Sequence, residues 1–95
     1  MQSPQEGPSL ARYPAVVAGE IIDRDSADPP WVQLAAILRA RIARGEITNR
    51  LPGERALQQE FDLAPVTIRK AIHALRAEGL VRTTPGMGTF VVRPD

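Results

Sequence analysis

The chain has 95 residues, no cysteine, one histidine and a formal net charge of +1. This length suits a single domain, and the lack of cysteine excludes disulfides and thiolate metal sites. His73 cannot form a metal cluster or a catalytic dyad with a thiol by itself, and no run approaches the roughly eighteen apolar residues of a membrane span. The N-terminus also lacks the pattern of a secretory signal. We therefore expect a cytoplasmic protein with no cofactor, no metal and no membrane contact.

Positive charge is concentrated in the later part of the chain. Residues 1–30 carry two basic and five acidic side chains, whereas residues 31–95 carry ten basic and six acidic ones. A basic footprint is typical of nucleic-acid binding, but a solvated basic face is the ordinary interpretation of so small an excess. Charge therefore favours a nucleic-acid partner only slightly.

Residues 1–19 are predicted to form a disordered arm, followed by one folded domain over residues 20–95. Pro4, Pro8 and Pro14 stand among small polar residues in the arm, which has too few large apolar groups to pack. The β-branched residues that follow favour a short strand over residues 20–23. Residues 25–30 read as a turn, because two prolines close the segment.

Residues 31–44 are predicted to form a long helix that ends at Gly45. Its apolar stripe, at helical spacing, comprises Trp31, Leu34, Ala35, Leu38 and Ile42. The Trp31 side chain is predicted to be a core anchor rather than a stacking platform. Three arginines lie off the stripe, and a solvated face is favoured for them over phosphate contact: Arg39, Arg41 and Arg44.

Residues 51–78 have the spacing of two helices joined by a tight turn. Pro52 suits a helix entrance, residues 62–64 form the break, and Pro65 suits the first position of a second helix over residues 65–78. A helix, a turn of three or four residues and a helix form the helix-turn-helix motif, whose second helix enters the DNA major groove. The predicted core face of that helix comprises Ile68, Ala71, Ile72 and Leu75; the opposite face comprises Val66, Arg69, Lys70 and His73.

Residues 80–94 are predicted to form a β-hairpin with its turn at Pro85–Gly88. A hairpin behind the last helix of a helix-turn-helix forms a wing, and a glycine-rich tip can approach a sugar-phosphate backbone closely. Thr83, Thr84 and Thr89 offer hydroxyl groups for phosphate oxygens. A plain connecting hairpin fits these residues equally well.

Six motifs in order resemble the DNA-binding domain of GntR-type winged helix-turn-helix regulators, over residues 30–92. They are Pro30-Trp31-Val32-Gln33-Leu34, Ile42-Ala43-Arg44-Gly45, Leu51-Pro52-Gly53-Glu54-Arg55, Leu63 to Ala71, Leu75 to Gly79, and Gly86 to Val91. The resemblance implies an α+β winged helix-turn-helix fold, mainly α, with three helices and a two- or three-stranded antiparallel sheet. Residues 20–23 would supply the third strand.

The same resemblance implies sequence-specific binding of double-stranded DNA and transcriptional regulation, expected to be repression. Helix 65–78 would lie in the major groove and wing 81–93 at the minor groove of a palindromic operator bound by a homodimer. Such a protein would be bacterial and nucleoid-associated when bound. The implied DNA-binding residues are Arg55, Ala64, Pro65, Val66, Thr67, Arg69, Lys70, Gly86, Gly88 and Thr89.

Three departures from the family pattern bear on the operator rather than on the fold. Ala64 replaces a capping serine, a loss of about 1 kcal/mol, and Gly53 weakens the first cap in the same way. Pro65 replaces a base-reading arginine and cannot donate a hydrogen bond. We therefore expect the site to be read through Arg55 and Arg69, because arginine can read guanine O6 and N7 with two hydrogen bonds.

Most family members carry a further C-terminal domain that binds a metabolite and dimerises, and this sequence stops three residues after Val92 without an evident effector pocket. It fits a stand-alone small regulator, an excised DNA-binding domain, or a winged helix that binds protein instead of DNA. The first two are favoured because Arg55, Thr67 and Arg69 persist. An enzyme is not expected, since the Gly86–Gly88 segment opens no helix and lacks the lysine of a phosphate-binding loop.

Overall fold

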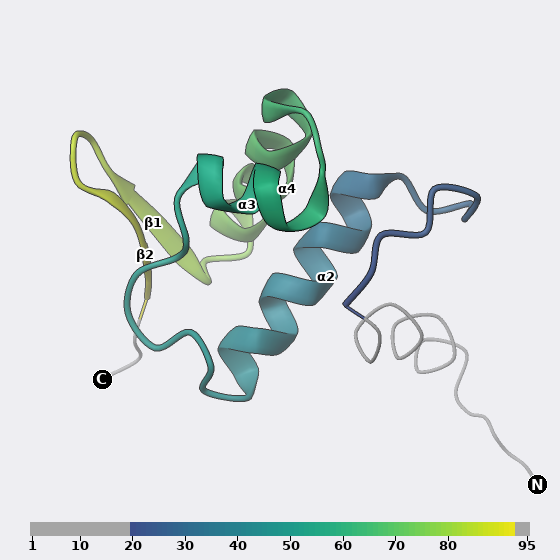
Figure 1. The fold of residues 1–95 in the computed structure, drawn as a ribbon. Coiled ribbons are helices and arrows are strands. Elements are labelled where there is room, and N and C mark those ends of the chain that lie inside the picture. Colours follow the sequence, from purple (N-terminus) through teal and green to yellow (C-terminus); the bar gives the residue numbers. More distant parts are fainter. Residues whose placement is uncertain (1–19, 93–95) are drawn as a thin grey trace, which may run out of the picture.

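The computed structural model describes residues 20–92, which form three helices followed by a β-hairpin (Figure 1). The helices are α2 (Pro30–Ala43), α3 (Glu54–Phe61) and α4 (Pro65–Ala77), and the strands are β1 (Val81–Thr84) and β2 (Gly88–Val91). Each predicted helix and the hairpin are confirmed to within a few residues. The predicted arm over residues 1–19 lies outside the described residues.

The helix-turn-helix of α3 and α4 is as short as its spacing predicts. Asp62 closes α3 in a left-handed conformation with φ 55°, and Pro65 occupies the first turn of α4. Neither Gly53 nor Ala64 caps the following helix with a side-chain hydrogen bond. The turn therefore depends on backbone conformation and on proline's preset φ rather than on caps.

Helix α4 lies at the centre of the hydrophobic core, between α2, α3 and β1. Its four predicted core residues are all buried: Ile68, Ala71, Ile72 and Leu75. Helix α2 is buried more widely than its predicted stripe, since Gln33, Ala36 and Ile37 are buried as well. Of these residues, Gln33 contacts the segment that precedes α2.

That segment, residues 20–28, is here called the strap. The strand predicted for residues 20–23 is wrong: Glu20 is in a turn with φ 51°, and no strand is assigned there. The Gln33 side chain, rather than a neighbouring strand, forms hydrogen bonds with the backbone of this segment. Its Oε1 accepts from the Asp23 amide at 2.8 Å, and its Nε2 donates to the carbonyls of Asp23 and Asp28, each at 2.8 Å. Tertiary hydrogen bonding thus overrides the local β propensity.

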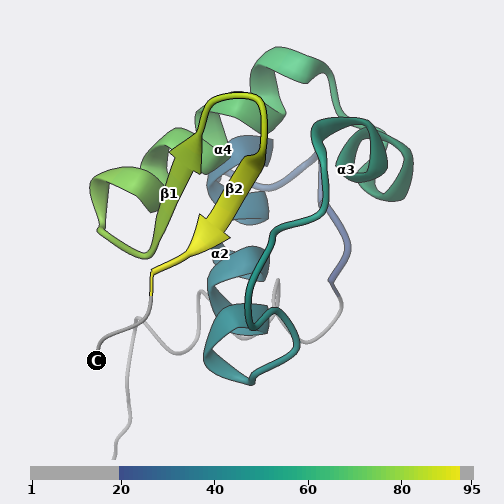
Figure 2. The ribbon, with the colours of Figure 1, turned by 90° about the vertical axis from the view of Figure 1, so that its left-hand side faces the viewer.

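The wing is an antiparallel pair, β1 with β2, in which Arg82 faces Phe90 and Thr84 faces Gly88. Residues 49–51, rather than the strap, run beside β2 as a short third partner (Figure 2). The Leu51 amide donates to the Thr89 carbonyl at 2.8 Å, and the Val91 amide donates to the Asn49 carbonyl at 2.7 Å. The segment that leads into α3 is therefore tied to the wing.

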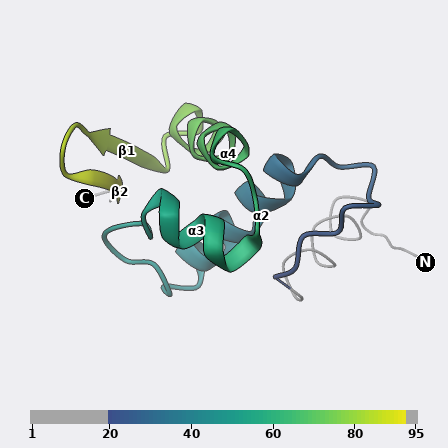
Figure 3. The ribbon, with the colours of Figure 1, turned by 45° about the horizontal axis from the view of Figure 1, so that its top comes forward.

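The wing and the strap lie at opposite ends of the described molecule, with the three helices between them (Figure 3). None of these helices is long and apolar enough to cross a membrane. Within residues 20–92, no group of three or more histidine, aspartate or glutamate side chains could hold a metal ion.

Candidate nucleic-acid interface

A groove of about 800 Å³ runs between α4, the wing and the segment that enters α3. One wall is the outer face of α4, where the side chains lie at helical spacing: Val66, Arg69, Lys70, His73 and Arg76. The other wall is the hairpin from Thr83 to Thr89. The open groove therefore joins the start of the second helix of the motif to the glycine-rich turn of the wing.

The groove brings together six of the ten residues predicted to bind DNA: Val66, Arg69, Lys70, Gly86, Gly88 and Thr89. Ala64 and Pro65 are exposed and Thr67 is half-buried at the first turn of α4, beside the groove but outside its lining. Arg55 is exposed on α3 and lines a separate, shallower hollow with Gln58, Gln59, Asp62 and Leu63.

Arg69 is held at the groove by a carboxylate from the preceding helix. Its Nε donates to Glu54 Oε2 at 3.2 Å, and the two side chains are 63% and 42% exposed. An ion pair as exposed as this one is worth about 0–1 kcal/mol. Glu54 thus orients the guanidinium while leaving it able to exchange this carboxylate for a stronger acceptor.

Lys70 is bound from the side of α2. Its Nζ lies 5.1 Å from the centroid of the Trp31 ring, a cation–π arrangement. Trp31 is half-buried and packs against the core, so the prediction of a core anchor is confirmed, with the added function of orienting a lysine. The ammonium group thus lies at the edge of the groove.

The wing presents a compact, partly apolar edge to the groove. The Thr83 and Thr89 hydroxyls face each other across the strands at 3.2 Å, so one of them donates to the other. Gly86 has φ 77°, a left-handed conformation that suits glycine in the turn. Val66 on α4 is 67% exposed opposite this turn, which is a surface suited to an apolar contact such as a thymine methyl.

Two groove cations were not predicted as site residues, Arg50 and Arg76. Arg76 lies seven residues after Arg69, so helical periodicity places both on one face of α4 and could have identified it. Arg50 lies in the loop before α3, where no periodic pattern points to the groove. Its position becomes evident only from its pairing with β2.

The arginines of α2 are bound by carboxylates on the surface away from the groove. Arg41 donates to Glu20 and Glu60 and stacks over the Phe61 ring at 5.4 Å, and its side chain is only 13% exposed. The predicted solvated face is therefore wrong for Arg41. Hydrogen bonds from Arg41 and then Arg44 lower the pKa of Glu20 from 4.5 to about 2.

Three helices, a tight helix-turn-helix and a β-wing beside the second helix of that motif define a winged helix-turn-helix DNA-binding domain. The sequence pattern described as "Bacterial regulatory proteins, gntR family" matches residues 31–91. The chain belongs to this family of regulators.

Two curated relatives and one solved structure illustrate the similarity. The HTH-type transcriptional regulator RB1450 of Rhizobium meliloti is 36% identical over 81 residues, which are 83% of this chain and 33% of that protein. The mannosyl-D-glycerate transport/metabolism system repressor MngR of Escherichia coli is 40% identical over 65 residues, 66% of this chain and 27% of that protein. The chain thus spans a third or less of the length of these relatives.

The structural similarity extends to a complex with DNA. AraR(DBD), crystallised in complex with operator ORE1, superposes with a TM-score of 0.68 and is 33% identical. The match covers 74% of this chain and 88% of that one. The fold and the family together identify the chain as a DNA-binding domain of a transcription regulator.

Proposed function

We propose that this domain binds an operator in double-stranded DNA through the groove between α4 and the wing, and that it represses transcription there. The observation that carries the proposal is the meeting of the first turns of α4 with a glycine-rich wing along one open, cation-bearing groove. Repression is supported by the relative MngR, which is named a repressor, and operator binding by the AraR complex. The start of α4 enters the major groove and the wing lies at the minor groove.

Within this proposal, Arg69 is the main base-reading residue. Its guanidinium is exposed at the second turn of α4 and exchanges Glu54 for the O6 and N7 atoms of a guanine. Val66, one turn earlier, contacts a thymine methyl. Arg55 contacts DNA from the first turn of α3, since its side chain is exposed there. Pro65 cannot donate a hydrogen bond to a base, so the adjacent base is read by shape only.

The proposal includes a homodimer on a palindrome. A domain of this size neutralises only a few phosphates, and a single copy would bind weakly at physiological salt. Two copies related by a two-fold axis double the contacts and fix the half-site separation at about one helical turn or a multiple of it.

Selection of duplexes from a random library by the purified 95-residue chain tests the proposal. Selected and scrambled duplexes are then titrated at two salt concentrations, and the mass of the complex is measured in solution. We expect a palindromic winner, bound by two copies, with an affinity that falls steeply with salt. Absence of enrichment, with equal binding to selected and scrambled duplexes, would contradict sequence-specific recognition.

A further inference from the structure

The side chain of Arg50 is held on the face of the wing. Residue 50 pairs with Phe90 of β2, and the hydrogen bonds of Asn49 and Leu51 to β2 fix the backbone on both sides of it. Paired residues of an antiparallel ladder share a face, and so does the residue two positions along the partner strand. Arg50 and Gly88 therefore lie on the same face of the hairpin.

Gly88 leaves room for the Arg50 guanidinium against its backbone. A Cβ atom at residue 88 would lie 2.8 Å from Nε, 3.3 Å from Nη2 and 3.4 Å from Cζ of Arg50. Gly88 also has φ 126°, a conformation that side chains rarely adopt. The planar group is thus seated on the peptide backbone of β2, and any side chain at residue 88 would displace it.

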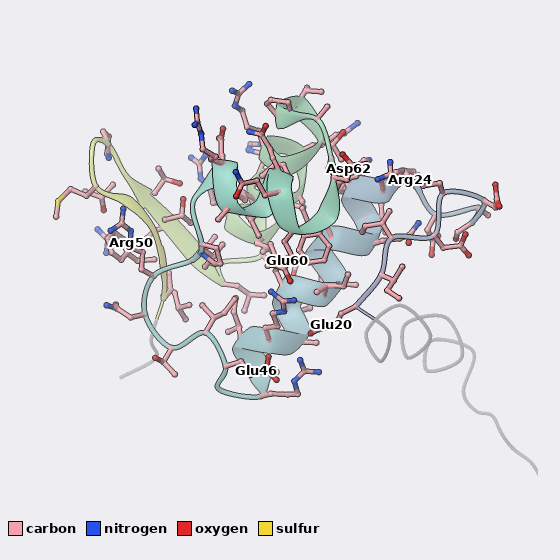
Figure 4. All side chains as sticks on the ribbon, viewed as in Figure 1. Glu20, Arg24, Glu46, Arg50, Glu60 and Asp62 are labelled. Carbon is pink, nitrogen blue, oxygen red and sulfur yellow. The ribbon has the colours of Figure 1, made fainter. Side chains whose placement is uncertain are left out.

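The guanidinium seated in this way has no carboxylate partner within residues 20–92. Arg39, Arg41, Arg44 and Arg69 each pair with a glutamate, whereas no residue from 20 to 92 forms an ion pair or a hydrogen bond with the Arg50 side chain. Figure 4 shows the Arg50 side chain beside the hairpin, away from the labelled carboxylates. The site is therefore an oriented, exposed cation that no carboxylate of residues 20–92 neutralises.

We propose that the Arg50 guanidinium, seated on Gly88, binds a backbone phosphate of the DNA on which the wing docks. This inference rests on the DNA-binding function proposed above. A wing at the minor groove lies between two sugar-phosphate strands, and Arg50 stands at the level of Phe90, behind the turn that would reach base edges. Its position therefore favours a phosphate over a base. Gly88, predicted to touch DNA, acts instead by seating Arg50.

The test compares Arg50→Ala with Arg39→Ala in the full chain. Arg39 lies on α2, pairs with Glu78 and does not line the groove, so Arg39→Ala removes one positive charge outside the proposed DNA-binding surface. Affinity for a selected and a scrambled duplex is measured from low to moderate salt, and circular dichroism confirms that each variant folds. Arg50→Lys retains the charge and serves as a second variant.

Loss of one phosphate contact should lower affinity for both duplexes by the same factor. For Arg50→Ala we expect a loss of about three- to tenfold and a salt slope reduced by about one. Arg39→Ala should stay within about twofold of the wild type, and Arg50→Lys should keep the wild-type slope. Equal behaviour of Arg50→Ala and Arg39→Ala would overturn the proposal, as would a loss confined to the selected duplex. A wild-type chain that binds neither duplex would overturn the proposed function as well, so the two failures are distinguishable.

A double-mutant cycle tests the seat itself. Gly88→Ala should weaken DNA binding in the wild-type background and weaken it less in the Arg50→Ala background, because no guanidinium remains to be displaced. The strain of a side chain at φ 126° is common to both backgrounds and cancels in the cycle. Additive losses would overturn the assignment of Gly88 as the seat of Arg50.

Discussion

The two ends of the domain use arginine in opposite ways. At the strap end, Arg41 and Arg44 share Glu20, and Arg24 donates to the carbonyls of Phe61 and Asp62 at 3.2 and 2.7 Å. At the groove end, Arg50 and Arg76 have no ion pair within the described residues, and Arg69 has only an exposed one. The first set closes the fold, whereas the second remains available to an anion.

This difference shows why net charge is a poor guide to the binding surface. Arg39, Arg41 and Arg44, in α2 or directly after it, account for much of the basic excess after residue 30. Their charge is neutralised by glutamates of the strap and α3 and by Glu46 and Glu78. Pairing with these carboxylates converts the cations into structural links between segments. Position on the groove, together with the absence of a strong carboxylate partner within residues 20–92, distinguishes the cations that can bind DNA.

The largest effect is expected from breaking the strap end. Gln33 is 1% exposed and satisfies three backbone groups of the strap, so Gln33→Ala removes three hydrogen bonds and leaves partly buried backbone groups of the strap without these partners. We expect the free energy of unfolding to fall by about 2–4 kcal/mol in urea denaturation. Gln59→Ala, an exposed glutamine of α3, should change it by less than about 0.5 kcal/mol. Equal stabilities of the two variants would show that the strap does not support α2.

At the groove end, substitution of Arg69 should weaken DNA binding most directly. Arg69→Ala should cost about 1–3 kcal/mol in binding to the selected duplex, or roughly 5- to 150-fold, while affinity for the scrambled duplex falls much less. Arg39→Ala removes an arginine that is bound to Glu78 away from the groove and should leave both affinities nearly unchanged. Equal losses of affinity in Arg69→Ala and Arg39→Ala would contradict the assignment of Arg69 as a base-reading residue.

Low pH should destabilise the strap end of the domain, because it protonates Glu20. The pKa of Glu20 is lowered to about 2 in the folded chain, so its contribution to stability is present above about pH 4.5 and is lost as pH falls toward 2. Glu20→Gln should therefore be less stable than the wild type at pH 7, and the difference should shrink at pH 3 and vanish near pH 2 in urea denaturation. Asp25→Asn serves as the control, because it removes an exposed strap carboxylate that has no ion pair in residues 20–92. A deficit of Glu20→Gln that does not depend on pH would contradict the paired state of Glu20.

The smallest effect is expected at the turn between the two ends. Ala64 has the extended conformation of an N-cap, with φ −68° and ψ 152°, but no side chain that can cap. Ala64→Ser should raise the free energy of unfolding by about 0.5–1 kcal/mol, because the serine hydroxyl can accept a hydrogen bond from a free backbone amide in the first turn of α4. A lower thermal midpoint for this variant would show that α4 does not begin as described.

The groove was largely predictable from the sequence, and the strap was not. Proline positions, the break at residues 62–64 and the apolar spacing of α4 are local signals, and they located the helix-turn-helix, whereas the family resemblance supplied the six groove residues. The strap depends on Gln33 and Arg24, which bond across 10 and 37 residues without any periodic pattern. Local β propensity at Ile21 and Ile22 therefore pointed to a strand that tertiary hydrogen bonds prevent. Arg50 was missed for a related reason, since a bridge to β2 rather than a helical period brings it to the groove.

Backbone amide chemical shifts, recorded while a selected duplex is added to the full chain, test the central claim most directly. We expect the largest changes in the first two turns of α4, at Arg50 and along the wing from Thr84 to Thr89, with the strap unchanged. Changes centred on the strap and the exposed side of α2, with the groove unaffected, would contradict the assignment of the groove as the DNA-binding surface.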